Sequence, residues 1–378
     1  MKLRLTPSRL EGTVTVPPAK SLLHRELICR YLAGQPTPLP PHAAQDVLAT
    51  RRALDCLTAG ETPVVDCGDS GSTLRFLLPL FMALGRTDAV FTGSDRLLRR
   101  PVPGELGLHF APDAITMTRP LTAGRWELPG DETSQLISGM LLSLPLLPEP
   151  SQLRITGEAV SRPYIRMTAA VMAHHGVTVQ AVEGGCYIPG GQRYRAAPLW
   201  EEPDWSASAF WLVLRRLTGG STLRVPLPPP PYLQGDAAVL TLLEHLPETM
   251  DVSDIPDLLP PLALYAALQP GRVTRFTHAA FLRRKESDRL TSITETLNAL
   301  GAHVRQEQDG LTVTGVARLH GGDVSAWGDH RIAMLAGCAA MAADSPVTLT
   351  GAETAAKSYP AFWRELAELG GKWEVLEP

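Results

Sequence analysis

Lysine is scarce in this chain of 378 residues, which has five lysines and thirty arginines. A chain that takes most of its positive charge from arginine needs few lysines for solubility, and the compact ammonium group does chemistry that a flat guanidinium cannot. Lys20, Lys285 and Lys357 lie in short segments crowded with polar and charged residues. The alternative is surface lysines left by a codon-biased genome, but this company makes the three lysines candidates for chemistry.

Cysteine is also scarce, and long apolar runs are missing. The five cysteines form no Cys-x-x-Cys pair and are odd in number, which indicates reduced thiols and excludes a disulfide framework or a typical zinc site. The apolar stretches, such as residues 332–343, stay short of the roughly 18 residues that a membrane-spanning helix needs. The first residues alternate like a strand and do not resemble a signal peptide. We expect a cytoplasmic protein without a membrane segment.

The charge balance excludes another class of partner. The formal net charge is -4 over the whole chain, so there is no overall electrostatic footprint for nucleic acid or an anionic membrane. Any anion must therefore be bound locally.

The length is too great for one core and predicts about two domains.

Two segments follow the same pattern. A helix opens near Arg166 and ends at Gly176, and a second opens at Arg289 and ends at Gly301. Each is followed by two strand-like stretches around a tight turn, and the second stretch closes with a glycine fourteen positions after the helix-ending glycine. A helix followed by a hairpin is thus one building unit used more than once.

A second kind of helix begins with small polar residues and is apolar nearly all round, which indicates burial. Together with the repeated unit, these helices predict an α/β fold in which helix-sheet units surround buried parallel helices, an inside-out arrangement used in two domains. The predicted buried helices span residues 20–32, 69–84, 131–144, 204–217 and 328–343.

The starts of these helices are candidate anion sites, because the first turn of a helix has unpaired N–H groups and a partial positive charge. Small donors stand at such starts in residues 69–73 and 133–135. Serine, threonine and aspartate at a helix start are more often N-caps than ligands. Binding is favoured by their companions Arg75, Arg100 and the segment 161–164, which reads Ser-Arg-Pro-Tyr.

The segment 283–289 is densely charged and precedes a helix. Its charges could simply compensate one another on a solvated helix start. Alternatively, Lys285 and Arg289 present cations to an anion while Glu286 stays available for proton transfer. Asp257 and Asp329 leave a similar choice between helix caps and site residues, and Arg331 stands directly before a wholly apolar run.

Taken together, these motifs resemble the 5-enolpyruvylshikimate-3-phosphate synthase (EPSP synthase) family of enolpyruvyl transferases. The likeness extends from Lys20 to Lys357 through nine motifs in the family's order: AKSLLHR, GDSGSTLRF, RRPV, TSQ, SRPY, IPDL, KESDRL, GDHR and AAKSYP. It implies an inside-out α/β fold with an active site in the cleft between two domains. Residues 1–18 with 203–378 would form one domain and residues 19–202 the other.

The resemblance also implies ligands and roles. Enolpyruvyl transfer from phosphoenolpyruvate to the 5-hydroxyl of shikimate 3-phosphate would release phosphate through a tetrahedral intermediate, with Asp257 as base, Glu286 as acid and Lys20 assisting. The residues implied for shikimate 3-phosphate are Lys20, Ser21, Arg25, Thr133, Ser134, Gln135, Ser161, Tyr164, Asp257 and Lys285. Those implied for phosphoenolpyruvate are Lys20, Gly71, Arg100, Gln135, Arg289, Arg331 and Lys357.

The same resemblance implies a monomeric enzyme of the shikimate pathway of aromatic amino-acid biosynthesis, a target of glyphosate. The enzyme implied by the resemblance needs no metal and no organic cofactor, because cationic side chains and helix ends stabilise the developing charge. Its partners would be its two small-molecule substrates, with no nucleic acid and no membrane.

Three positions depart from the family pattern. Thr133 replaces a more usual serine, and Asp69 adds a carboxylate beside an anionic pocket, which leaves its orientation open. The stretch after Arg100 is short and broken by proline and glycine, so we expect one of the family's six helix-sheet units to be trimmed.

Two other functions compete with this interpretation. UDP-N-acetylglucosamine enolpyruvyl transferase shares the fold and the donor, but it typically carries a reactive cysteine where Gly93 to Gly104 of this chain has none. A sugar-phosphate-binding protein that has lost turnover is the other. Asp257 and Glu286 argue against it, because a pure anion binder has little use for carboxylates.

Overall fold

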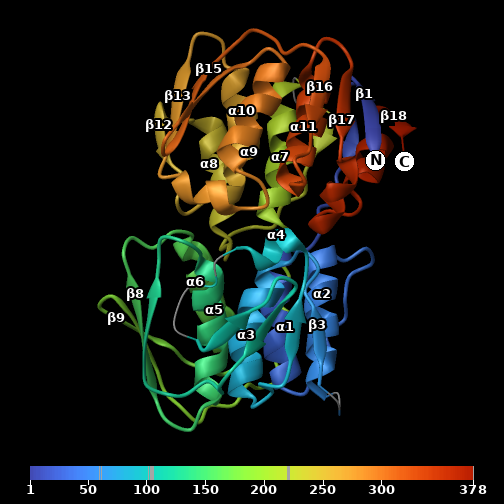
Figure 1. Ribbon diagram of the computed structural model, residues 1–378. Coiled ribbons are helices and arrows are strands. Elements are labelled where there is room, and N and C mark those ends of the chain that lie inside the picture. Colours follow the sequence, from blue (N-terminus) through green and yellow to red (C-terminus); the bar gives the residue numbers. More distant parts are fainter. Residues whose placement is uncertain (59, 61, 101, 103–105, 219–221, 378) are drawn as a thin grey trace. The chain divides into compact units, whose positions relative to one another are not determined.

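The computed structural model describes residues 1–378 except 59, 61, 101, 103–105, 219–221 and 378 (Figure 1). Its chain divides into two compact units. Unit 1 consists of Met1–Pro18 and Pro203–Pro378, and unit 2 of Ala19–Glu202. Each unit combines helices with sheets that lie against them, and each is described by itself.

The strands form small sheets of one repeated type. In three of the four-stranded sheets, two parallel strands come first, and the second strand of a following antiparallel hairpin pairs with the second of them. In the fourth, the first and last strands of the chain take the place of the hairpin. In unit 2 the two sheets have the orders β3-β4-β6-β5 and β7-β8-β10-β9. Their strands are β3 (Val64–Asp66), β4 (Val90–Thr92), β5 (Leu108–Phe110), β6 (Ala114–Met117), β7 (Arg125–Pro129), β8 (Ser151–Thr156), β9 (Gln180–Val182) and β10 (Gly185–Ile188).

Unit 1 repeats this topology with the orders β12-β13-β15-β14 and β16-β17-β1-β18. The second of these sheets joins the two ends of the chain, because β1 pairs antiparallel with both β17 and β18 (Figure 1). The strands are β1 (Lys2–Thr6), β12 (Thr249–Asp251), β13 (Val273–Thr277), β14 (His303–Glu307), β15 (Gly310–Thr314), β16 (Gly322–Ser325), β17 (Val347–Thr350) and β18 (Lys372–Glu377), with a short parallel pair β2 (Gly12–Thr13) and β11 (Leu223–Arg224).

Helices of two kinds accompany these sheets. Nearly every residue of the inner helices is buried, whereas the outer helices bury one face. The inner helices are α1 (Lys20–Leu32), α3 (Gly71–Ala83) and α5 (Ser134–Ser143) in unit 2, and α7 (Trp205–Leu217), α9 (Leu259–Ala267) and α11 (His330–Ala342) in unit 1. The outer helices are α2 (Gln45–Asp55), α4 (Asp95–Leu98), α6 (Arg162–His174), α8 (Val239–Glu244), α10 (Arg289–Ala299) and α12 (Phe362–Glu368), joined by 3-10 turns at Cys56–Thr58, Leu144–Leu146, Gly235–Ala238, Pro256–Leu258, Ala280–Arg284 and Ala352–Lys357.

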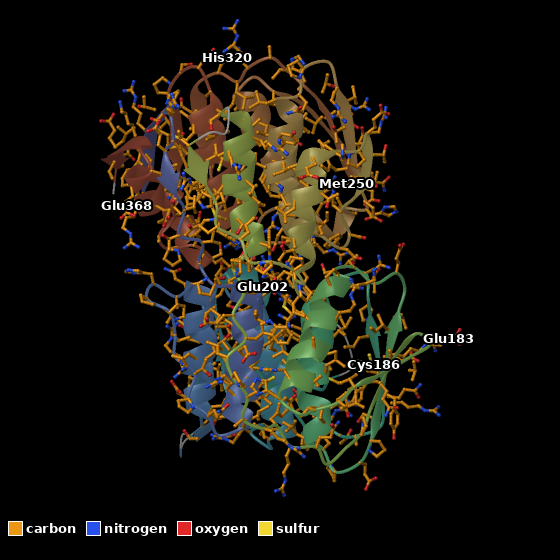
Figure 2. All side chains as sticks on the ribbon, turned by 180° about the vertical axis from the view of Figure 1, so that it is seen from behind. Glu183, Cys186, Glu202, Met250, His320 and Glu368 are labelled. Atoms are coloured by element: carbon orange, nitrogen blue, oxygen red, sulfur yellow. The ribbon has the colours of Figure 1, made fainter. Side chains whose placement is uncertain are left out.

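The predicted inside-out fold and its repeated helix-hairpin unit are confirmed. Helix α10 leads into β14 and β15, and α6 leads into β9 and β10. The turn between β9 and β10 carries Glu183, which lies at the outer edge of unit 2, and Cys186 lies further in, in β10 (Figure 2). Helix α6 begins at Arg162, about one turn earlier than the sequence indicated, because Ser161 adopts a left-handed φ of 55° and Pro163 suits the first turn.

All five predicted buried helices are present, and α9 is a sixth that the sequence analysis missed. Its first turn contains Pro260 and Pro261, residues that break a helix when they stand in its interior. The first turn tolerates proline, because the N–H groups there have no partner within the helix.

One close approach fixes the inner helices of unit 2. A Cβ added at Gly139 of α5 would clash with the backbone oxygen of Arg75 in α3. Only glycine allows this distance between the two backbones. The starts of α3 and α5, which carry Gly71 and Gln135, are thereby brought together.

The trimming expected after Arg100 concerns a helix. Helix α4 has only four residues. Helix α6, which takes the same position in the next helix-sheet repeat of unit 2, has thirteen. The sheet beside it keeps four strands. Residues 101 and 103–105 of the predicted short stretch lie outside the described residues.

Candidate active site

Arg289 is the centre of a charged cluster in unit 1. It is the first residue of α10, and its side chain is 1% exposed. Nη1 donates to Asp257 Oδ1 at 2.8 Å and Nη2 to Glu286 Oε2 at 2.9 Å. Nε donates to Asp329 Oδ2 at 3.1 Å. One guanidinium thus binds three carboxylates that come from separate segments of the chain.

The electrostatics of Arg289 follow from these neighbours. Burial by itself would lower its pKa, but Asp329, Asp257 and Glu286 outweigh burial and raise the pKa above its ordinary value. Arg289 therefore stays charged, and a buried permanent cation needs the carboxylates to remain in place.

Two further cations extend the cluster. Arg331 Nη2 donates to Asp257 Oδ2 at 3.0 Å, and Lys357 Nζ donates to Glu286 Oε1 at 3.2 Å. Each of the two carboxylates implied as base and acid consequently contacts two cations. The structure thus brings together Asp257, Glu286, Arg289, Arg331 and Lys357. Lys285 lies with Nζ 5.4 Å from the ring centroid of Phe281.

Asp329 resolves one choice left open by the sequence. Its carboxylate accepts from the backbone N–H of Arg331 at 2.9 Å, as an N-cap of α11 does, and it also binds Arg289. The cap and the site residue are therefore the same group. Asp288, by contrast, caps α10 and binds Arg283.

The sequence analysis missed Asp236, which is 1% exposed. Ser206, in the first turn of α7, donates a hydrogen bond to its carboxylate. Burial raises the pKa of Asp236 to about 7, and the negative charge of Asp257 adds to the rise. The residue ends a proline-rich run, residues 225–236, which predicts a loop and gives no local signal of a site residue.

Lys20 begins α1 in unit 2, and its Nζ donates to Asp46 Oδ2 in α2 at 2.8 Å. The side chains of Lys20 and Asp46 are 16% and 7% exposed. Asp46 was also missed, because nothing in the sequence relates a residue near the start of one helix to the start of the previous one.

A second cluster surrounds Gly71, the first residue of α3. A Cβ at this position would lie 2.9 Å from Arg75 Nη1, 3.0 Å from Gln135 Oε1 and 3.4 Å from Arg100 Nη1. Arg75 Nη1 donates to Gln135 Oε1 at 3.3 Å, and Gln135 Nε2 donates to Ser72 Oγ at 3.2 Å. The predicted residues Gly71, Gln135 and Arg100 therefore converge, together with Arg75.

The small polar residues at these helix starts do act as caps. Ser70 Oγ accepts from the N–H of Thr73 at 3.1 Å, and Thr133 Oγ1 accepts from the N–H of Gln135 at 3.1 Å. Ser134 follows as the buried first residue of α5. Ser161 precedes α6 in its left-handed conformation and makes no side-chain cap.

Arg25 is 2% exposed and is hydrogen-bonded within unit 2. It donates to Thr168 Oγ1 at 2.7 Å, to Ser138 Oγ at 3.2 Å and to the backbone oxygens of Ser21 and Tyr164 at 2.6 and 3.0 Å. Burial lowers its pKa to about 10. These contacts hold α1 against α5 and α6, and a substrate contact by Arg25, Ser21 or Tyr164 stays a prediction.

Asp69, one of the departures from the family pattern, has partners in and beside α4. Ser94 Oγ donates to Asp69 Oδ1 at 2.6 Å, and Arg96 forms an ion pair with Oδ2. The extra negative charge is therefore compensated by Arg96 in α4.

Among the residues that the structure describes, no group of three or more His, Cys, Asp or Glu side chains could hold a metal ion. The described helices include none that is long and apolar enough to cross a membrane.

Solved structures with the same architecture include an EPSP synthase and an enolpyruvyl transferase. EPSP synthase from Acinetobacter baumannii matches with a TM-score of 0.76 at 22% identity, covering 100% of both chains. The enolpyruvyl transferase NikO from Streptomyces tendae matches with a TM-score of 0.73 at 18% identity, covering 99% of this chain and 98% of the other. These likenesses define the fold class.

The sequence comparisons narrow the class. The family model described as EPSP synthase (3-phosphoshikimate 1-carboxyvinyltransferase) matches residues 42–248 and 244–366. The 3-phosphoshikimate 1-carboxyvinyltransferase of Clostridium kluyveri is 35% identical over 98% of this chain and 98% of the relative. That of Methanocorpusculum labreanum is 33% identical over 98% of this chain and 99% of the relative. The chain belongs to the EPSP synthase family, as the motifs predicted.

Proposed function

We propose that this protein transfers the enolpyruvyl group of phosphoenolpyruvate to the 5-hydroxyl of shikimate 3-phosphate and releases phosphate, a step of aromatic amino-acid biosynthesis. Family membership over the whole chain supports the reaction. The observation that carries the mechanism is the charged cluster, in which Asp257 and Glu286 are held by the same guanidinium of Arg289.

The two carboxylates take different parts in this mechanism. Asp257 removes the proton from the 5-hydroxyl as its oxygen attacks C2 of phosphoenolpyruvate, while Glu286 protonates the C3 methylene. The tetrahedral intermediate then loses phosphate from C2 and a proton from C3, which restores the double bond. Arg289, Arg331 and Lys357 supply the positive charge that a phosphate and a carboxylate require.

Unit 2 supplies groups that suit the anionic parts of the substrates. The starts of α3 and α5 direct backbone N–H groups and partial positive charge toward an anion. Arg100, Gln135 and Gly71 converge there, and Lys20 stands at the start of α1. We propose that units 1 and 2 are the two functional domains and that both contribute residues to one active site, as the resemblance implies.

The remaining predicted ligands belong to the acceptor in this proposal. The residues proposed for shikimate 3-phosphate are Lys20, Ser21, Arg25, Thr133, Ser134, Gln135, Ser161, Tyr164, Asp257 and Lys285. We further propose that the enzyme is a cytoplasmic monomer. The five cysteines are free thiols, which suits the reducing cytoplasm.

Phosphate release from phosphoenolpyruvate tests the proposal, with shikimate 3-phosphate and UDP-N-acetylglucosamine as parallel acceptors. We expect release with shikimate 3-phosphate alone. Release only with UDP-N-acetylglucosamine would transfer the proposal to the rival enzyme, and release with neither would favour the non-catalytic binder.

The two carboxylates are tested by Asp257→Asn and Glu286→Gln. Each variant should fold and should lose roughly a hundredfold or more in kcat, the scale of general acid-base groups. Circular dichroism and thermal unfolding would establish that the variants are folded. Full activity in either one would remove that residue from its role.

A further inference from the structure

A buried hydrogen-bond network joins the first two turns of α1 and α2 to the start of α3. His24 stands one turn after Lys20 in α1, and Thr50 stands one turn after Asp46 in α2. Lys20 meets Asp46 at 2.8 Å, and His24 Nδ1 meets Thr50 Oγ1 at 2.7 Å. Two polar contacts one turn apart therefore set the alignment of α1 against α2.

The network continues from α2 to α3. Thr50 Oγ1 lies 2.7 Å from Thr73 Oγ1, and Thr73 Oγ1 lies 2.8 Å from Ser70 Oγ and 3.2 Å from the backbone oxygen of Asp46. Ser70 is the N-cap residue directly before Gly71. The chain of contacts thus runs from His24 to the start of α3 and back to the residue that holds Lys20.

The protonation of His24 gives this chain a direction. The ring is 0% exposed, and burial lowers its pKa to about 3, with Asp46 opposing and Lys20 and Arg25 assisting the fall. The imidazole is therefore neutral and carries one N–H. Nε2 is buried without a hydrogen-bond partner among the described residues, and Phe76 packs against the ring edge to face. A proton on Nδ1 avoids burying an unpaired donor, so we assign the N–H to Nδ1.

With this tautomer, each hydroxyl donates to the next. His24 Nδ1–H donates to Thr50, Thr50 donates to Thr73, and the Thr73 hydroxyl proton is shared between two acceptors, Ser70 Oγ and the oxygen of Asp46. A buried chain in which every donor points the same way admits one arrangement, so it specifies the positions of its ends.

We propose that His24 is a positioning residue for the enolpyruvyl transfer, which fixes Lys20 and the Gly71 end of α3 through Thr50 and Thr73 without touching either substrate. The proposal rests on the assignment of Lys20 and Gly71 to the phosphoenolpyruvate pocket. It goes beyond that assignment because it states what holds these groups at the correct distance from one another.

A second buried histidine of unit 2 provides the matched control. His175 Nε2 contacts Glu26 Oε2 at 3.2 Å, and both side chains are 0% exposed. Glu26 lies two residues after His24 in α1, and Nδ1 of His175 meets the backbone oxygen of Arg195 at 2.9 Å. This pair therefore stabilises the same helix, but its contacts lead away from Lys20 and Gly71.

The experiment compares His24→Leu, Thr50→Val, His24→Asn and His175→Gln with the wild type. For each we would measure thermal unfolding, kcat, and KM for both substrates. His24→Leu and Thr50→Val should lower kcat/KM for phosphoenolpyruvate by about ten- to a hundredfold, because a displacement near 1 Å can cost that much. KM for shikimate 3-phosphate should change less. The double variant His24→Leu/Thr50→Val should lose no more kcat/KM than the more impaired single variant, because both substitutions break the same chain of hydrogen bonds.

Two comparisons separate positioning from simple stability. His24→Asn places an amide N–H as many bonds from the backbone as Nδ1, so it should restore most of kcat/KM. His175→Gln should lower the unfolding temperature while kcat/KM stays within about threefold, the range expected when a change is remote from the site.

Several outcomes would overturn the proposal. Unchanged kcat/KM in folded His24→Leu or Thr50→Val would do so, as would an equal loss in His175→Gln, or a folded His24→Asn as impaired as His24→Leu. Lys20→Met distinguishes this failure from failure of the donor assignment. An inactive Lys20→Met beside a normal His24→Leu would refute the positioning role alone, whereas an active Lys20→Met would refute the assignment on which it rests.

Discussion

The two clusters of this protein differ in the groups that their cations contact. In unit 1, Arg289 contacts three carboxylates, and Arg331 and Lys357 each contact one of them. Around Gly71 in unit 2, the cation Arg75 meets the amide of Gln135, and that amide meets the hydroxyl of Ser72. The cations of the first cluster contact carboxylates, whereas Arg75 of the second contacts a neutral amide.

The difference shows which cluster suits which task. The helix starts beside Gly71 present unpaired N–H groups and a partial positive charge, so the cluster of unit 2 is suited to binding an anion. In unit 1 the carboxylates that are proposed to move protons also hold the cations, so binding and proton transfer share one network. Removing one member there leaves buried charges without their partners.

Arg289→Met should have the largest effect and test this dependence directly. It leaves three carboxylates without their shared cation, so we expect a loss of about 3–5 kcal/mol in the free energy of unfolding and loss of activity. Urea unfolding and phosphate release would measure both. Arg305, whose side chain is 76% exposed and pairs with Glu307, is the control. Arg305→Met should cost under about 1 kcal/mol, and equal losses would contradict the special role of Arg289.

Asp236→Asn should have the next largest effect, and the effect should depend on pH. The folded pKa of about 7 lies above the ordinary value of 3.8, so folded protein keeps a proton that unfolded protein has released. The stability of the wild type should therefore fall as pH rises from about 4 to about 7, by as much as roughly 1.4 kcal/mol per pH unit. The asparagine variant should lack this component. The free energy of unfolding of the variant, relative to that of the wild type, should then increase from about pH 4 to about pH 7.

Denaturant unfolding at pH 4.5, 5.5, 6.5 and 7.5 would reveal this growth. Asp344→Asn is the control, because hydrogen bonds from Ser345 and His320 lower the pKa of this carboxyl. The stability that Asp344 contributes is lost only as pH falls through its lowered pKa. A constant difference between Asp236→Asn and the wild type would show that Asp236 is ionised throughout.

Gly71→Ala should have a smaller effect that is confined to the cluster of unit 2. The added methyl group meets the mobile ends of Arg75, Gln135 and Arg100, so the fold should tolerate it. We expect KM for phosphoenolpyruvate to rise by about tenfold, the lower range for one methyl in a tight pocket. Glyphosate should inhibit the wild type in competition with phosphoenolpyruvate and inhibit this variant less. Gly60→Ala adds its methyl to open space and should change neither value.

Asp69→Asn should have the smallest effect. Its carboxylate pairs with Arg96 at a partly exposed position, where an ion pair contributes about 1 kcal/mol or less. We expect kcat/KM for phosphoenolpyruvate to remain within a few-fold of the wild type. A large gain in that value would show instead that the Asp69 charge opposes the anionic donor.

Local sequence predicted a good part of this fold. Polar starts followed by apolar runs indicated the helices that became α1, α3, α5, α7 and α11, because burial on all sides removes the amphipathic pattern. The alternation in Lys2–Thr6 indicated a strand and is matched by its burial. Helix α9 escaped because Pro260 and Pro261 suggest a break, although they stand in a first turn that tolerates them.

The candidate site was predictable only in part. The family motifs predicted Asp257, Glu286, Arg289, Arg331 and Lys357, and the structure brings these residues together, while their roles stay predictions. Asp46 and Asp236 have no such signal. Their importance comes from neighbours distant in the sequence, as the contact of Asp46 with Lys20 shows.

The sequence by itself determined the buried helices, the repeated hairpin units and the family, because periodicity, turn residues and motif order are properties of neighbouring residues. Tertiary structure decided which carboxylate meets which cation. Asp257, Glu286 and Asp329 reach Arg289 only when the 3-10 turn Pro256–Leu258, α10 and α11 pack together, and the resulting burial is what gives these pairs their strength.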